Sequence, residues 1–168
     1  MGANPVVHHL NATERTPTMP LHVACTNVFP EFKAALSAAA GCTDVTLSVL
    51  PNQCVQIFGM FHDPVSRDTD QIELSSFKLH TMPGCSAILV SSRVRVTVPW
   101  RGKGLGKLLN QFRARVAREM GCSTLQCTTV QSNERQNTLL RKLGWKQIDD
   151  FLNPRTENTV LIWTRTVE

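Results

Sequence analysis

A glycine-rich turn with interleaved basic residues is the strongest chemical signal in the sequence. It occupies residues 101–107 and reads Arg-Gly-Lys-Gly-Leu-Gly-Lys, directly before a predicted helix. The first turn of a helix leaves about four backbone N–H groups without internal partners, at the positive end of the helix dipole. Glycines let the backbone approach an anion closely. The pattern therefore predicts a phosphate-binding turn.

Two common phosphate-binding patterns do not fit this turn. The dinucleotide fingerprint has the spacing G-x-G-x-x-G, and here the third glycine comes one residue too early. The P-loop needs a Lys followed by Ser or Thr, but Leu108 follows Lys107. The pattern that fits the residues is R-G-x-G-x-G.

The turn and the residues around it resemble the GNAT superfamily of N-acetyltransferases. Besides the turn, the resemblance rests on the strand residues Val94-Arg95-Val96, on Asn133, and on the ending Leu143-Gly144-Trp145. It covers residues 86–152. This resemblance implies an α+β fold whose mixed, mostly antiparallel sheet is flanked by helices and splayed at the cofactor-binding strand. It also implies acetyl-CoA as the cosubstrate, with no metal ion.

The resemblance further implies how acetyl-CoA would be held. The pantetheine arm would pair with the backbone of the strand before the turn, the pyrophosphate would bind the turn, and the Asn133 side chain would meet the arm. A β-bulge is one way to open such a strand. For Asn133 the alternative role is a helix N-cap. The cofactor-binding residues so implied are Val94, Arg95, Val96, Arg101, Gly102, Lys103, Gly104, Leu105, Gly106, Lys107 and Asn133.

The predicted reaction is acetyl transfer to a primary amine by direct attack on the thioester. Such an amine needs a general base, and the candidates are Glu73 and His80 on a strand beside the cofactor strand. Members of the family often place a Tyr to protonate the leaving sulfur, but that position is Leu140 and the chain contains no Tyr. Ser132 is the substitute candidate for the acid, or else an N-cap. A two-step route through Cys127 is the other possibility, although a mid-strand cysteine is more typical of a core.

Composition and charge narrow the partners. The net charge is +5, and eight of the 18 Lys and Arg residues fall within residues 93–118, which favours a local phosphate site over a diffuse polyanion surface. No export signal or membrane-length apolar run is evident, so we expect a cytoplasmic protein with reduced cysteines.

The alternative functions are a non-catalytic acyl-CoA-binding module and a nucleic-acid-binding protein, and the sequence contains no recognised nucleic-acid-binding motif. The acetyl acceptor is open, and so is the choice between monomer and homodimer.

The hydrophobic pattern predicts an N-terminal arm over residues 1–19 and one domain over residues 20–168. A mostly antiparallel front half is followed by a strand-helix-strand crossover. Within the domain, Pro30 suits the first turn of a helix and Gly41 its end. Strands are predicted over residues 21–26, 44–50, 54–61, 72–79, 87–98, 124–130, 145–152 and 158–166, and helices over residues 30–41, 105–120 and 133–143.

Overall fold

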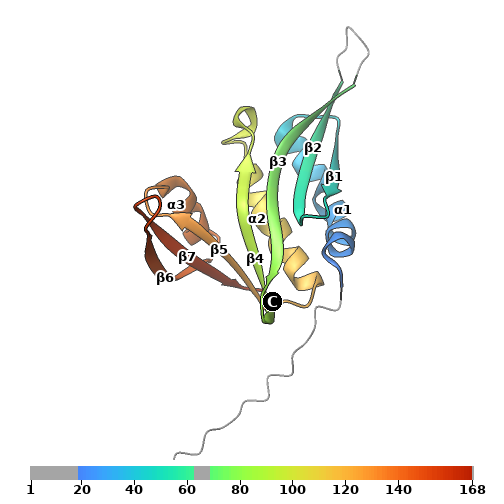
Figure 1. Cartoon of the computed structure of the whole chain (residues 1–168). Coiled ribbons are helices and arrows are strands. Elements are labelled where there is room, and N and C mark those ends of the chain that lie inside the picture. The colour runs from blue at the N-terminus through green and yellow to red at the C-terminus, as the bar shows by residue number, and fades with distance from the viewer. Residues whose placement is uncertain (1–18, 63–68, 168) are drawn as a thin grey trace, which may run out of the picture.

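The computed structural model describes residues 19–62 and 69–167, which form a seven-stranded mixed sheet with three α-helices (Figure 1). The strand order is β1-β2-β3-β4-β5-β7-β6, and β4 and β5 are the parallel pair. The predicted α+β class and mostly antiparallel sheet are confirmed. The predicted N-terminal arm lies outside the described residues except for Met19. The elements are α1 (Leu21–Ala40), β1 (Asp44–Val49), β2 (Cys54–His62), β3 (Thr69–Met82), β4 (Cys85–Val96), the 3-10 turn η1 (Val98–Trp100), α2 (Leu105–Glu119), β5 (Thr124–Val130), α3 (Glu134–Lys142), β6 (Lys146–Asn153) and β7 (Asn158–Thr166).

One continuous helix, α1, replaces the strand that was predicted at residues 21–26, so that prediction is wrong. Pro30 lies inside the helix rather than at its start. Because proline has no N–H, Pro30 cannot donate a hydrogen bond to the Thr26 carbonyl four residues earlier. Both residues are exposed to water. Burial of one helix face outweighs that loss. The buried positions recur at helical spacing: Ala24, Cys25, Val28, Phe29, Leu36 and Ala40.

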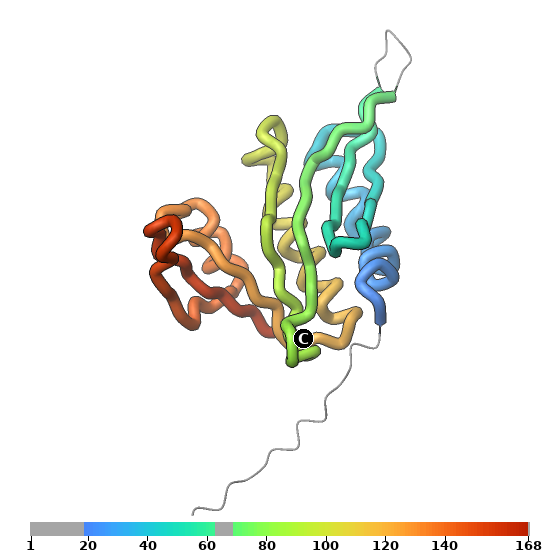
Figure 2. The backbone as a smooth tube through the Cα atoms, in the orientation of Figure 1, coloured from blue at the N-terminus to red at the C-terminus, as the bar shows by residue number. Residues whose placement is uncertain are grey.

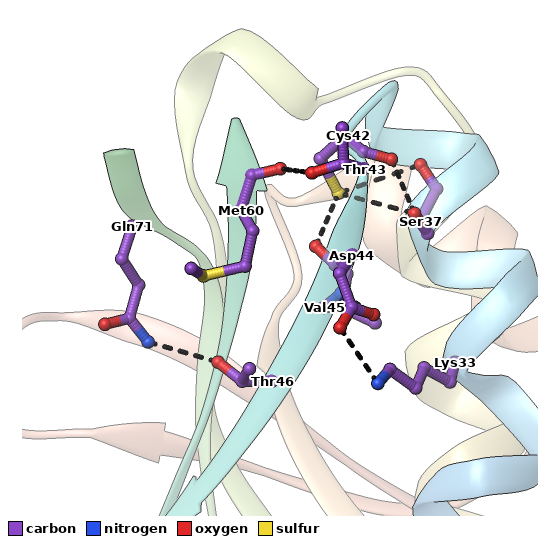
Figure 3. Close-up of polar contacts among 9 residues, drawn as sticks. All are labelled: Lys33, Ser37, Cys42, Thr43, Asp44, Val45, Thr46, Met60 and Gln71. Carbon is purple, nitrogen blue, oxygen red and sulfur yellow. Dashed lines mark hydrogen bonds and ion pairs between the residues drawn. The ribbon is translucent and has the colours of Figure 1, made fainter. Parts of the chain in front are cut away.

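Polar contacts join the end of α1 to the edge of the sheet (Figure 3). The Ser37 hydroxyl donates to the Cys42 carbonyl at 2.6 Å, and the Lys33 ammonium lies 3.0 Å from the Asp44 carboxylate. The Thr43 hydroxyl donates to a β2 carbonyl at 2.8 Å. Gly41 ends α1 in the left-handed conformation at φ 70°, as predicted. These contacts fix where β1 begins.

Phe112 of α2 is the centre of an aromatic cluster that packs the helices on one face of the sheet. Its ring meets those of Phe29 and Phe32 of α1 edge to face, at centroid distances of 6.3 and 5.6 Å. On the sheet side it meets Phe77 of β3 at 6.2 Å. Edge-to-face pairs at these distances add to the stabilisation from apolar burial. The cluster therefore holds α2 beside α1 on that face of the sheet.

All six cysteines are free, and three of them are buried. In residues 19–62 and 69–167, no group of three or more His, Cys, Asp or Glu side chains is placed to hold a metal ion. The helices of the described part of the chain are all too short or too polar to cross a membrane.

Candidate functional site

The two parallel strands β4 and β5 separate part-way along their length. They pair from Ile88 opposite Thr124 to Ser91 opposite Cys127, and both strands then continue without pairing with each other. Figure 2 shows the two strands running side by side at one end and diverging toward the other. We call the space between the separated strands the split, and the Ser91–Cys127 pair its closed end. The splayed sheet that the family resemblance implied is confirmed.

A β-bulge in β4 lies just beyond the closed end of the split. Ser76 of β3 pairs with Arg95 and Lys78 pairs with Ser92, so two steps on β3 match three on β4. Arg93 takes up the extra residue and has a positive φ of 53°, which few residues other than glycine adopt. A bulge bends and twists the strand that carries it. It therefore turns β4 away from β5.

The backbone of β4 beyond the bulge presents polar groups to the split. The Thr97 N–H donates to the Leu74 carbonyl of β3 at 2.9 Å. Because alternate residues of a strand direct their N–H and C=O groups to opposite sides, Val96 and Val94 direct theirs to the split. The Arg101 Nε donates to the Val96 carbonyl at 2.9 Å. An added strand that pairs with this carbonyl must therefore displace the Arg101 side chain.

The glycine turn leaves a row of backbone N–H groups without acceptors. Gly104 precedes α2 with φ 87° and receives no side-chain cap, and residues 101–104 are exposed. The N–H groups of Arg101 and Lys107 donate to backbone carbonyls. Within the described residues, the N–H groups of residues 102–106 have no hydrogen-bond acceptor. Free donors and the positive end of the α2 dipole thus meet at the open end of the split.

A cation from α3 also reaches the turn, and sequence reasoning missed it. A methyl group at Gly102 would lie 3.7 Å from Nη2 of Arg135, and one at Gly106 would lie 3.4 Å from Leu139. The N-terminal part of α3 therefore faces the turn. The nearest sequence signal is that Arg135 comes two residues after Asn133. The predicted cations Arg101, Lys103 and Lys107 are exposed around the same turn.

Trp100 anchors the segment between β4 and the glycine turn. It is 8% exposed, its indole N–H donates to the Ala40 carbonyl at 3.1 Å, and its ring lies 5.5 Å from that of Phe61. An indole that is buried and hydrogen-bonded is a rigid attachment. Trp100 therefore packs into the core and holds the start of the turn in place.

The two residues at the start of α3 take different roles. Asn133 is the N-cap of α3, and its side-chain oxygen accepts from the Gln136 N–H at 3.2 Å. This contact commits the oxygen of Asn133 to the helix, while its predicted contact with the cofactor stays a prediction. Ser132 is exposed beyond the end of β5. The cap role that was the alternative for Ser132 belongs to Asn133.

The structure does not bring the two candidate bases together. Glu73 and His80 are seven residues apart on β3, which is about 23 Å along a strand. The Glu73 carboxylate accepts from Gln56 Nε2 at 2.9 Å and lies beyond the part of β3 that pairs with β4. His80 pairs with Val90, the residue before Ser91 in β4. At most one of the two can lie close enough to one thioester to act as the general base for the attack on it. His80 is nearer than Glu73 to the closed end of the split.

Leu140 and Cys127 are both buried. Leu140 is fully buried in the core, so the position that the family often gives to a Tyr offers no proton donor here. Burial raises the pKa of the Cys127 thiol to about 11, although the Arg113 charge opposes the rise. A thiol with that pKa is almost entirely protonated at neutral pH.

Known proteins resemble this chain in sequence over part of its length and in fold over most of it. Residues 81–145 match the sequence profile of the acetyltransferase (GNAT) family. No curated protein sequence matches the chain. Similar solved structures include an IAA acetyltransferase from Bacillus cereus, at 13% identity and a TM-score of 0.58 over 73% of this chain and 99% of that chain.

Two further structures show the same likeness. The acetyltransferase of the GNAT family from Streptococcus pneumoniae is 13% identical, with a TM-score of 0.54 over 70% of this chain and 68% of that chain. Nourseothricin acetyltransferase is 16% identical, with a TM-score of 0.55 over 72% and 71%. The chain therefore has the GNAT fold, and its residues 81–145 match the sequence profile of that acetyltransferase family. Acetyl-CoA is the acetyl donor of this family.

Proposed function

We propose that the chain transfers an acetyl group from acetyl-CoA to a primary amine by direct attack of the amine on the thioester. The observation that carries the proposal is the row of N–H groups at residues 102–106, which lack acceptors among the described residues and stand beside the split. A diphosphate is an anion of the size and charge that such a row of donors binds. The exposed cations around the turn, Arg135 included, add counter-charge.

The proposed position of the pyrophosphate would orient the rest of the cofactor. With its pyrophosphate at the open end, the pantetheine arm runs along β4 and pairs with Val94 and Val96, after Arg101 leaves the Val96 carbonyl. The thioester lies at the other end of the arm, toward Ser91 and Cys127. Backbone N–H groups that face the split near the bulge are placed to stabilise the oxyanion that forms on the carbonyl.

The acceptor amine must lose a proton before it attacks. A lysine-like amine with a pKa of about 10.4 is neutral in only about one in 2,500 molecules at pH 7. We assign the general base to His80, acting through water, because it lies two residues from Lys78, which pairs with Ser92 beside the bulge. Phe77 and Leu79 are buried on the helix side, so His80 points to the opposite face of β3.

Direct attack is favoured over an acetylated enzyme. Cys127 is the cysteine at the closed end of the split, and its pKa of about 11 leaves only about one thiolate in 10,000 at pH 7. Thiolate, rather than thiol, is the nucleophile in acyl transfer. A single-step transfer needs no such ionisation.

The second candidate function is a non-catalytic acyl-CoA-binding module. It is favoured by the buried Leu140 and by the absence of Tyr from the sequence. Turnover separates the two candidates. Purified protein is mixed with acetyl-CoA and, in separate reactions, with a peptide α-amine, a polyamine and an aminoglycoside, and release of free thiol is followed. Transfer to any of these amines supports the enzyme, whereas tight binding of acetyl-CoA with no turnover on the panel supports the module. No binding at high micromolar acetyl-CoA contradicts both.

A further inference from the structure

A buried arginine lies beneath the closed end of the split. Arg113 of α2 is 2% exposed, and its Nη1 donates to the Ser91 hydroxyl at 2.6 Å. Its Nε donates to the Leu109 carbonyl at 3.0 Å, and its guanidinium lies 5.8 Å from the centre of the Phe77 ring. Every one of these partners is uncharged. The arginine is therefore held in place without an anion.

The charge of Arg113 has no carboxylate to balance it among the described residues. The ion pairs there join Lys33 to Asp44, and Arg115 to Glu31 and Glu119. Burial lowers the pKa of Arg113 to about 10, which still leaves the side chain charged at neutral pH. Arginine is almost never fully buried unless it is paired, because an isolated charge in a protein interior is strongly destabilising. An unbalanced cation of this kind calls for an anion that arrives later.

A second buried donor lies one turn earlier on the same face of α2. Asn110 is 0% exposed, and its side-chain nitrogen has no acceptor in the described part of the chain. Its oxygen accepts from Trp145 Nε1 at 2.9 Å and, more weakly, from Arg165 Nη1 at 3.5 Å. One buried donor in this part of the core therefore has no acceptor among the described residues. Together with the charge of Arg113, this donor favours negative rather than positive charge in the region.

Among the described residues, the side chains that face this region come from four elements, and only two of them, Cys127 and Arg165, are titratable or charged. Ser91 comes from β4 and is neutral, and Cys127 comes from β5 as a protonated thiol. Phe77 of β3 offers a ring face. Arg165 of β7, next to Asn110, adds a second cation. The potential at the closed end is therefore positive.

We propose that Arg113 stabilises the coenzyme A thiolate as it leaves the acetyl group, in place of the proton donor that Leu140 cannot be. This inference rests on the proposed function. As the amine nitrogen bonds to the carbonyl carbon, the carbon–sulfur bond breaks, and its electron pair stays on sulfur. The amine proton leaves to the base. Sulfur then carries a full negative charge at the closed end, where the field of a buried cation is little screened.

The test measures the pKa of the thiol of coenzyme A bound to the protein. Thiolate absorbs in the ultraviolet, so bound coenzyme A is titrated with pH, and the spectrum of protein bound to desulfo-coenzyme A is subtracted to remove the protein's own cysteines. We expect the bound thiol to titrate at least about one pH unit below free coenzyme A, a tenfold rise in thiolate. A residue with a purely structural role would not move this value.

Two variants locate the effect. Arg113→Lys keeps the charge and should keep most of the shift, while Arg113→Met keeps the bulk without the charge and should abolish it. The same Met variant should lower kcat by about 10- to 100-fold with little change in KM. An equal thiol pKa in wild type and Arg113→Met overturns the inference. If Arg113→Met does not fold, the wild type decides: a bound thiol that titrates at or above free coenzyme A overturns it. A wild type that binds no coenzyme A refutes the proposed function itself.

Discussion

Ser91 of β4 and Cys127 of β5 are the last pair of residues that face each other before the two strands separate. This pair divides the site into two regions of different chemistry. Beyond it, the bulge at Arg93 and the glycine turn leave backbone groups facing the split, where we propose that acetyl-CoA binds. Beneath it lies the buried Arg113. The position of this pair therefore sets how far a cofactor arm can enter the sheet.

Loss of the Arg135 charge should weaken acetyl-CoA binding. Arg135 extends over the glycine turn, and a charge-assisted contact to phosphate contributes about 1.5–3 kcal/mol. We expect Arg135→Ala to raise the dissociation constant about tenfold in low salt, as measured by calorimetry. Lys142→Ala removes the same charge from the exposed last turn of α3 and serves as the matched control. Equal affinities for the two variants would show that Arg135 plays no part.

The roles of His80 and Glu73 can be separated by replacing each residue with glutamine. We expect His80→Gln to lower kcat by about 100-fold, in the range typical of a lost general base. Glu73→Gln keeps a partner for Gln56 and should retain most of the activity, because Glu73 lies far from the closed end. The reverse result, with Glu73→Gln inactive and His80→Gln active, would reassign the base.

Cys127 should be dispensable for chemistry. Because its thiol stays protonated at neutral pH, Cys127→Ala should turn over acetyl-CoA within about threefold of wild type, with a small loss of stability from the lost packing. Mass spectrometry of the wild type mixed with acetyl-CoA and no acceptor should show no acetylated protein. Detection of an acetyl group on Cys127 would instead establish a two-step route.

Cys25 should destabilise the protein at alkaline pH. Burial in α1 raises the pKa of its thiol from 9.0 to about 12. Above pH 9 the thiol therefore ionises in the unfolded chain but not in the folded one, so the free energy of unfolding falls as pH rises. At pH ~11 the expected loss is about 2–3 kcal/mol.

Urea unfolding of wild type and Cys25→Ala between pH ~8 and ~11 measures this loss. The variant should start less stable at pH ~8, because a buried side chain is truncated, and should then lose less stability on the way to pH ~11. If the free energy of unfolding fell equally with pH in the two proteins, the prediction that burial raises the pKa of the Cys25 thiol would be wrong.

The sequence predicted the parts of the fold that depend on local signals. The helix predicted over residues 105–120 and the strand predicted over residues 124–130 each have a local periodicity or composition of their own, and both were placed correctly. The start of α1 was misread because local proline chemistry was weighed without the long-range burial that overrides it. Packing against α2 is not visible in a local window.

The functional site, like the fold, could be predicted only where its residues are close together in the sequence. The glycine turn was recognised because its chemistry is contiguous in the chain, whereas Arg135 and Arg113 reach the site only through the packing of α3 and α2. In the sequence Arg113 is one of the eight Lys and Arg residues within residues 93–118, and the structure places it in the core. Burial of a single polar residue on an amphipathic helix depends on what packs there, which spacing alone does not determine.

The central claim is that the free N–H groups at the start of α2 bind the diphosphate of acetyl-CoA, and calorimetry on two glycine variants tests it most directly. Gly104 and Gly41 both have positive φ and open space around the missing side chain, so alanine strains each backbone similarly. Gly104→Ala should weaken acetyl-CoA binding at least about tenfold, because the strain falls on the donor row. Gly41→Ala, at the end of α1, should bind like wild type. Equal binding by both variants, or none by the wild type, would contradict the account.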